Sequence, residues 1–253
     1  MQKFVVTLSV LLVLNIMLMV QAKPDTFYPY YFSKEKIENP AIKRIILVND
    51  ILVKPQRQAL KNNQILFQQI YDYLTLHGYK VINQGVFNQI LTSKVEQWGH
   101  PFDSSNGQND LRKKEKIIQS ILTDPRIQQQ ADAVLLFSTL EKSIAFKPGN
   151  KMIFYWNGVY RRLKIIGNRG IPKEHRWPAL IRTASLNAIL YKIKTKQLVF
   201  HSLGGIDLSQ SIDSRKDRPR IISNKGLLED KRKNKEAITL ALYPFIKNKK
   251  LNH

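Results

Sequence analysis

The chain has 253 residues and contains no cysteine, which excludes disulfide bonds, thiolate metal sites, cysteine nucleophiles and lipid attachment at a lipobox. Hydrophobic residues make up 43% of the sequence, which is enough for a packed core and excludes wholesale disorder. Lysine and arginine (41 residues) outnumber aspartate and glutamate (19 residues), so the net charge is +22 and anionic partners are favoured.

Residues 1–22 have the pattern of a secretory signal peptide. Lys3 supplies the basic start, Phe4 to Val20 form a nearly uncharged apolar stretch, and Ala22 is a small residue suited to cleavage. We predict cleavage after Ala22 and export of the rest of the chain, to the periplasm or beyond the cell. An uncleaved anchor is the alternative, because the apolar stretch reaches the lower length limit for crossing a bilayer. No transmembrane helix is expected after the leader.

The next segments predict an arm followed by a strand, helix, strand unit. Residues 23–41 mix prolines with aromatic side chains without a clean period, so we expect an irregular arm lying on the body. Residues 42–248 are predicted to form a single α/β domain. Its first strand is the branched apolar run 42–48, a helix ends at His77–Gly78, and the strand 79–82 follows. Such a crossover makes the two strands parallel.

The middle of the chain continues with helices and a third strand. A second helix covers residues 86–98, residues 100–109 are turn formers, and Asp110 can cap a basic helix. Asp124–Pro125 starts a short helix with a capping residue and a first-turn proline. The apolar run 131–137 is the third buried strand.

From residue 148 onward the pattern changes to hairpins. Asn157–Gly158 is the strongest short hairpin signal in the chain, because both turn positions need a positive φ. A second hairpin is expected around Lys194–Lys196, with its outgoing strand ending at Gly204–Gly205. Residues 209–235 are polar and basic and predict a mobile loop, and residues 235–245 predict a closing helix. The fold class is therefore α/β, with a mixed sheet, an N-terminal βαβ unit, C-terminal β-hairpins and a closing helix.

This order resembles a group of envelope domains. The segments that carry the resemblance are GYKVI, ADAVLLF and ASLNAILYKIKTKQLVFHSLGG, followed by the closing helix. The pattern is similar to the α/β domain of the TolB N-terminal region, of CsgG and of LpoB. The resemblance implies a periplasmic protein that works by contacting other proteins rather than by catalysis. The chain departs from the group in lacking the lipid-carrying cysteine and in its strong basic charge.

Catalytic and cofactor motifs are absent from the sequence. The turn after Val48 lacks the glycines that bind phosphates, there is no Gly-x-Ser-x-Gly motif, and no two histidines have metal-site spacing. We therefore expect no cofactor, no metal site and no enzymatic activity. The alternative is a hydrolase or transferase acting on an anionic envelope polymer, with Asp50, His100 or Asp103 as acid and base.

Basic and aromatic residues are concentrated in residues 142–206. This segment has thirteen lysines and arginines against Glu174 alone, and eight aromatic side chains. Strand alternation in the Asn157–Gly158 hairpin places the apolar side chains on one side and the tyrosines and cations on the other. The candidate binding residues there and in the following segment are Tyr155, Tyr160, Arg161, Arg162, Lys164, Arg169, Arg176 and Trp177.

These features predict an exported envelope protein that binds without catalysing a reaction. Its partner would be an envelope protein or an anionic glycan or lipid surface, contacted through the basic and aromatic hairpin. Nucleic acid is disfavoured, because the chain carries an export signal and lacks the aromatic spacing of oligonucleotide-binding sheets. The alternative interpretation is that the lysines form a solvated surface and the aromatic rings fill the core. The oligomeric state stays open.

Overall fold

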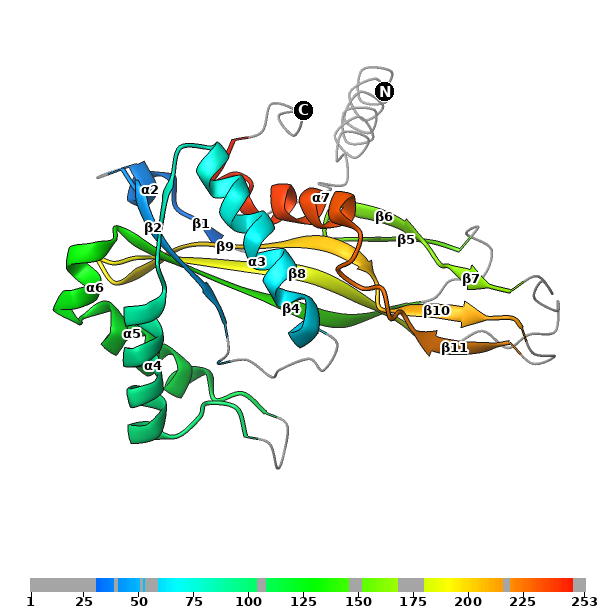
Figure 1. Ribbon diagram of the computed structural model, residues 1–253, viewed down its shortest axis with the longest axis horizontal. Coiled ribbons are helices and arrows are strands. Elements are labelled where there is room, and N and C mark those ends of the chain that lie inside the picture. The colour runs from blue at the N-terminus through cyan, green and yellow to red at the C-terminus, as the bar shows by residue number, and fades with distance from the viewer. Residues whose placement is uncertain are drawn as a thin grey trace, which may run out of the picture.

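The structure is a computed structural model that describes residues 31–38, 41–50, 52, 59–103, 108–145, 152–167, 180–215 and 219–247 (Figure 1). The predicted leader at residues 1–22 and the first part of the predicted arm lie outside these residues. Within the described part of the chain, no helix is both long enough and apolar enough to cross a membrane.

The described residues form helices and strands in alternation and then mainly strands. The helices are α2 (Lys34–Glu38), α3 (Ala59–Leu76), α4 (Gly85–Trp98), α5 (Leu111–Leu122), α6 (Pro125–Gln130) and α7 (Lys231–Leu242). The strands are β1 (Tyr31–Phe32), β2 (Arg44–Asn49), β3 (Lys80–Ile82), β4 (Ala133–Ala145), β5 (Ile153–Trp156), β6 (Val159–Arg162), β7 (Ile165–Ile166), β8 (Leu180–Lys192), β9 (Gln197–Leu208), β10 (Gln210–Asp213) and β11 (Arg220–Ser223).

A mixed six-stranded sheet is the centre of the fold. Its strand order is β1-β9-β8-β4-β2-β3. Strand β2 pairs in parallel with β3 and β4, whereas β4, β8, β9 and β1 pair antiparallel in succession. The β2–α3–β3 segment is the predicted βαβ unit, and α7 is the closing helix. The predicted α/β class with a mixed sheet is thus confirmed.

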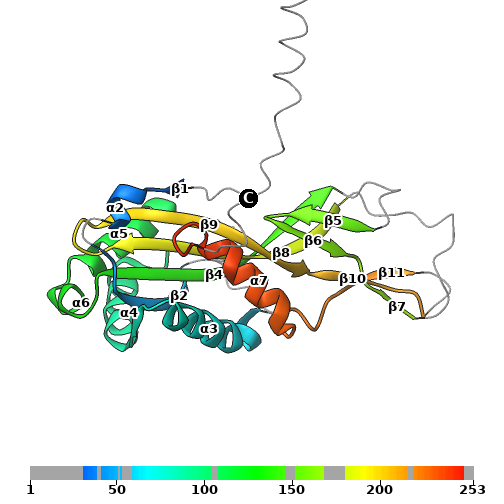
Figure 2. The ribbon, with the colours of Figure 1, turned by 90° about the horizontal axis from the view of Figure 1, so that it is seen from above.

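Both faces of the sheet are covered, which explains why β2 is apolar without alternation. Ile45 and Leu47 belong to a core cluster with side chains of α3 and α7. Ile46 and Val48 belong to a second cluster with side chains of α4, α5 and α6. Figure 2 shows α3 and α7 together on one side of the sheet. The sheet is therefore the middle layer between two sets of helices.

Asp132 fixes the starts of the parallel strands β2 and β4. Its carboxylate accepts hydrogen bonds from the backbone amides of Lys43 (3.0 Å) and Arg44 (2.8 Å) and from the Arg44 guanidinium (3.0 Å). Burial alone would raise the pKa of Asp132, but these hydrogen bonds outweigh it and hold the pKa below its usual value. The interaction sets the register between the two strands.

The predicted helix ends are largely confirmed. Asp110 accepts a hydrogen bond from the amide of Lys113, and Asp124 accepts one from the amide of Arg126, so both act as N-caps. Gly78 follows α3 with a φ of +84°, the conformation that favours glycine after a helix.

The last strand of the predicted second hairpin does not end at Gly204–Gly205. Strand β9 continues through both glycines to Leu208. A Cβ atom on Gly204 would lie 2.0 Å from the carbonyl oxygen of Ala237 in α7. The glycines are thus required by close packing within a strand and do not mark a turn.

The prediction of a mobile loop at residues 209–235 is wrong. This segment contains β10, β11 and the start of α7, and β10 joins β11 and β7 in a three-stranded sheet. Ile212 is fully buried, and the buried side chain of Asp213 forms an ion pair with Arg215 (2.8 Å). The polar side chains of the segment are thus partly buried in a regular structure, and the others are exposed. Figures 1 and 2 show the small sheet at the end of the molecule, beyond the helices.

The described part of the predicted arm is regular. Strand β1 pairs with β9 at the edge of the central sheet, where Phe32 lies opposite Phe200. The two rings contact edge to face at 6.3 Å, and α2 follows directly. The aromatic residues of residues 31–38 therefore extend the sheet, in contrast to the irregular arm that was predicted.

We predict that Asp132→Asn lowers the free energy of unfolding by about 1–3 kcal/mol at pH 7, because it removes charge-assisted hydrogen bonds at the start of two strands. A carboxylate with a depressed pKa stabilises the fold above its unfolded-state pKa of about 4, and this contribution is lost as the pH falls through the folded-state value. Urea unfolding at pH 7 and pH 3 should show the difference shrinking at the lower pH. The exposed Asp72→Asn variant is the control, and an equal loss for both variants would contradict the role of Asp132.

We predict that Gly204→Ala destabilises the fold by about 3 kcal/mol, since the new methyl group would overlap the backbone of α7. Gly226→Ala is the matched control, because a Cβ there meets only the flexible side-chain ends of Glu229 and Asn224 at 3.1 Å or more. Thermal or urea unfolding of the two variants measures the difference. Equal stability of the two variants would show that α7 moves aside at little cost.

Candidate functional site

The β5–β6 hairpin is formed as predicted around Asn157–Gly158. Both turn residues have positive φ values, 40° and 82°, as a two-residue hairpin turn requires. Across the strands, Tyr155 lies opposite Tyr160 and Ile153 lies opposite Arg162. The register thus places the two tyrosines side by side on the same surface of the hairpin.

The inner face of the hairpin is part of the core. Phe154, Trp156, Val159 and Leu163 are buried in a cluster that also includes Leu240 of α7. The alternation predicted from the sequence therefore holds for these apolar side chains. Their burial fixes which side of the hairpin is left facing solvent.

The outer face of the hairpin consists of Ile153, Tyr155, Tyr160, Arg162 and Lys164, all of which are exposed. The two tyrosine rings lie 4.6 Å apart at an angle of 40°. Tyr160 is 66% exposed. An aromatic pair with the neighbouring cation Arg162 is thus displayed on a two-stranded ribbon, and Lys164 follows just beyond its end.

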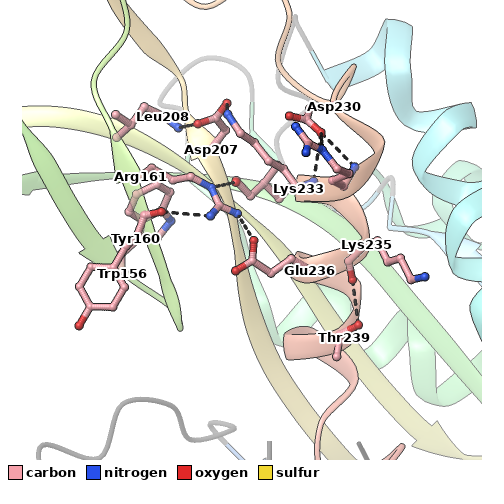
Figure 3. A network of polar contacts seen from close by, with 12 residues as sticks. Trp156, Tyr160, Arg161, Asp207, Leu208, Asp230, Lys233, Lys235, Glu236 and Thr239 are labelled. Carbon is pink, nitrogen blue, oxygen red and sulfur yellow. Dashed lines mark hydrogen bonds and ion pairs between the residues drawn. The ribbon is translucent and has the colours of Figure 1, made fainter. Parts of the chain in front are cut away.

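Arg161 differs from the prediction, because it binds within the protein. Its Nε donates to the carbonyl of Ile206 (2.8 Å), and its terminal nitrogen donates to Glu236 of α7 (2.8 Å). The side chain is only 10% exposed. Figure 3 shows the guanidinium directed toward α7, and we assign it to holding the hairpin rather than to binding a ligand.

Polar contacts at the turn attach the hairpin to β8 and β9. The indole nitrogen of Trp156 donates to Ser185 Oγ (3.2 Å), and the side-chain amide of Asn157 donates to the same oxygen (2.8 Å). The amide of Gly205 donates to the carbonyl of Asn157 (2.9 Å). A Cβ on Gly205 would lie 2.3 Å from Val159 Cγ2, so the approach of the hairpin depends on this glycine.

A second ion pair joins α7 to the same region of β9. Lys233 binds Asp207 at 2.7 Å, and Asp230 caps the helix by accepting from the amides of Arg232 and Lys233 (Figure 3). These hydrogen bonds hold the pKa of Asp230 below its usual value, against the opposing effect of burial. Helix α7, strand β9 and the hairpin are thereby connected by charged groups as well as by apolar contacts.

Part of the basic segment lies away from this surface, and three of the candidate binding residues are not described. Arg169, Arg176 and Trp177 lie outside the described residues. Lys192, Lys194 and Lys196 lie at the far end of the β8–β9 hairpin. Arg182 and Lys192 are ten positions apart on β8, which is about 33 Å at the usual rise per residue. The basic segment 142–206 is therefore not one continuous patch.

The acid and base candidates of the enzymatic alternative have structural partners. Asp50 is buried and forms an ion pair with Lys114 of α5, and it accepts from the amide of Leu52. His100 Nδ1 accepts from the amide of Phe102 (3.0 Å). Among the described residues, no group of three or more histidine or acidic side chains could hold a metal ion. Asp50 therefore stabilises the turn after β2 and is paired with a lysine in the described structure.

One polar cluster on the sheet was not predicted. His201 Nε2 lies 2.8 Å from Asn187 Oδ1, and the Asn187 amide donates to Ser138 Oγ (3.2 Å). Burial, together with the charge of Lys114, holds the pKa of His201 below its usual value. Only the strand pairing brings these three residues together, so no local sequence pattern indicates the cluster.

Comparison with known proteins gives no family assignment. No family model and no curated protein matches the sequence. Among solved structures, the chain aligns with one described as that of a neuraminyllactose-binding hemagglutinin homolog from Helicobacter pylori, with a TM-score of 0.31 and 10% identity over 78% of this chain and 80% of that one. Similarity at this level identifies neither a family nor a ligand.

We predict that the Arg161–Glu236 pair couples the hairpin to α7 by about 1 kcal/mol, a modest value because Glu236 is 49% exposed. A double-mutant cycle with Arg161→Met and Glu236→Gln in urea unfolding measures it. Arg161→Met alone should cost more than Glu236→Gln, since it also removes the hydrogen bond to Ile206. Strictly additive effects would show that the ion pair contributes nothing.

Proposed function

We propose that the protein is an exported, non-catalytic binding protein that contacts its partner through the outer face of the β5–β6 hairpin. The partner is an envelope protein or an anionic envelope surface. The observation that carries the proposal is the exposed Tyr155–Tyr160 pair beside Arg162, held on a hairpin whose inner face is buried.

The chemistry of the outer face suits recognition. Tyrosine and arginine are the residue types that contribute most often to binding energy at protein interfaces, because they combine large contact area with hydrogen bonding. Ring faces also attract cations and stack on planar or apolar groups, while Arg162 and Lys164 attract anions. Ile153 adds an exposed apolar side chain between these groups.

The attachment of the hairpin also favours binding. Contacts from Trp156, Asn157 and Arg161 fix the hairpin to β8, β9 and α7 before any partner is present. A surface that is already ordered loses less conformational entropy on association. The export pattern of residues 1–22 and the resemblance to contact-forming envelope domains agree with an envelope partner.

The proposal predicts that Arg162→Glu combined with Lys164→Glu abolishes salt-sensitive association with detergent-free envelope fractions of the source cell. Tyr155→Ser combined with Tyr160→Ser should weaken association by about tenfold or more, because both rings leave the interface. Co-sedimentation at low and high salt, followed by quantification of bound protein, measures both effects.

The matched control is Lys194→Glu combined with Lys196→Glu, which makes the same charge change at the far end of the β8–β9 hairpin. This control should bind like the wild type. If association survives both hairpin variants, or falls equally in the control variant, the binding surface does not lie on the hairpin.

A further inference from the structure

Helices α3 and α7 lie side by side over the same face of the sheet (Figures 1 and 2). A groove lies between these two helices. Its volume is about 340 Å³. The apolar part of its lining comes from Tyr73 and Leu76 of α3 and from Ile238 of α7. Tyr73 and Ile238 are buried in the core, whereas Leu76 is 78% exposed. A large apolar side chain thus stands at the rim of an apolar depression.

Three cations from the beginning of α7 line the same groove: Lys231, Arg232 and Lys235. The positive end of a helix macrodipole disfavours cations at this position. Within the described part of the chain, no carboxylate lies within ion-pair distance of Lys231 or Lys235, and Arg232 reaches Asp230 only at 4.0 Å. The neighbouring Lys233, in contrast, is paired with Asp207. The groove therefore has a positive rim that the described structure neutralises only in part.

Polar groups of α3 complete the lining. Gln69 Oε1 is buried and has no hydrogen-bond partner among the described residues. The hydrogen-bonding capacity of this acceptor is therefore unused within the described structure. Asp72 also lines the groove and accepts from Gln68 (2.8 Å), so the lining holds three positive charges against one negative charge.

We propose that the α3–α7 groove is a second docking surface, which binds an acidic, leucine-containing peptide segment of a partner protein. Such a segment supplies carboxylates for Lys231, Arg232 and Lys235 and apolar side chains for the surface around Leu76. Binding of an amphipathic segment between two helices is a common mode of peptide recognition. Bare phosphate would satisfy the cations but leave the apolar surface exposed.

This surface is separate from the outer face of the β5–β6 hairpin. Helix α7 contacts the hairpin through Glu236 and Leu240, whereas Lys231, Lys235 and Ile238 line the groove with α3. The proposal therefore goes beyond the function assigned to the hairpin. Substitutions on one surface should leave binding at the other unchanged.

Fluorescence anisotropy with a short labelled peptide of glutamate and leucine tests the proposal on the full chain without its leader. The same peptide pattern with lysine in place of glutamate is the probe control. The acidic peptide should bind, and Lys231→Glu combined with Lys235→Glu should weaken it by about tenfold or more. This variant should remain folded, because glutamate is favoured near the start of a helix. Leu76→Ser should weaken binding by a few fold through the lost apolar contact.

Two matched charge variants distinguish the surfaces. Lys194→Glu with Lys196→Glu, and Arg162→Glu with Lys164→Glu, change the net charge equally and should leave peptide affinity within about twofold of the wild type. Failure of the wild type to bind the acidic peptide, or equal losses in all three charge variants, would overturn the groove proposal. The proposal would also be overturned if the protein bound phosphatidylglycerol vesicles through Lys231 and Lys235 but did not bind the peptide. The groove would then be a membrane-binding surface.

Discussion

The close packing of strand β9 at Gly204–Gly205 is the constraint on which the arrangement of the second half of the chain depends. At Gly204 the backbone of α7 lies where a side chain would otherwise be, and at Gly205 the hairpin residues Trp156 and Val159 do. Adjacent residues of a strand face opposite sides. Because neither glycine has a side chain, α7 can pack against one face of β9 and the hairpin against the other.

This arrangement determines which side chains are left for binding. The hairpin buries Phe154, Trp156 and Val159, so Tyr155 and Tyr160 must face solvent. Arg161 reaches from the hairpin to α7. The first turns of this helix supply the cations that line the groove beside α3. The same packing thus produces an aromatic and basic surface on the hairpin and a basic groove beside α3.

Local patterns predicted most of the layered part of the fold, because each element there carries a short-range signal. The branched run at Ile45–Val48, the caps at Asp110 and Asp124, and the turn at Asn157–Gly158 depend only on neighbouring residues. The sides of the hairpin also followed from strand alternation. The exposed tyrosine pair was therefore accessible from the sequence.

Features set by long-range contacts were not predictable in this way. Gly204–Gly205 resembles a turn unless the position of α7 is known, and Ser211, Ile212 and Asp213 resemble a polar loop because their burial depends on pairing with β11 and β7. Arg161 has the sequence pattern of an exposed binding residue, because its partners, Ile206 and Glu236, are distant in sequence. The groove between α3 and α7 likewise requires the tertiary structure, although the run of cations after Asp230 was visible.

Photo-crosslinking in intact cells tests the proposed binding role of the hairpin most directly. A photoreactive phenylalanine derivative is placed at the exposed Tyr160, and in separate variants at Lys194 on the far hairpin and at the buried Trp156. Binding through the outer face predicts a discrete crosslinked species from position 160, its loss when Arg162 and Lys164 are both changed to glutamate, and none from positions 194 and 156. Crosslinks that arise at position 194 but not at position 160 would contradict it.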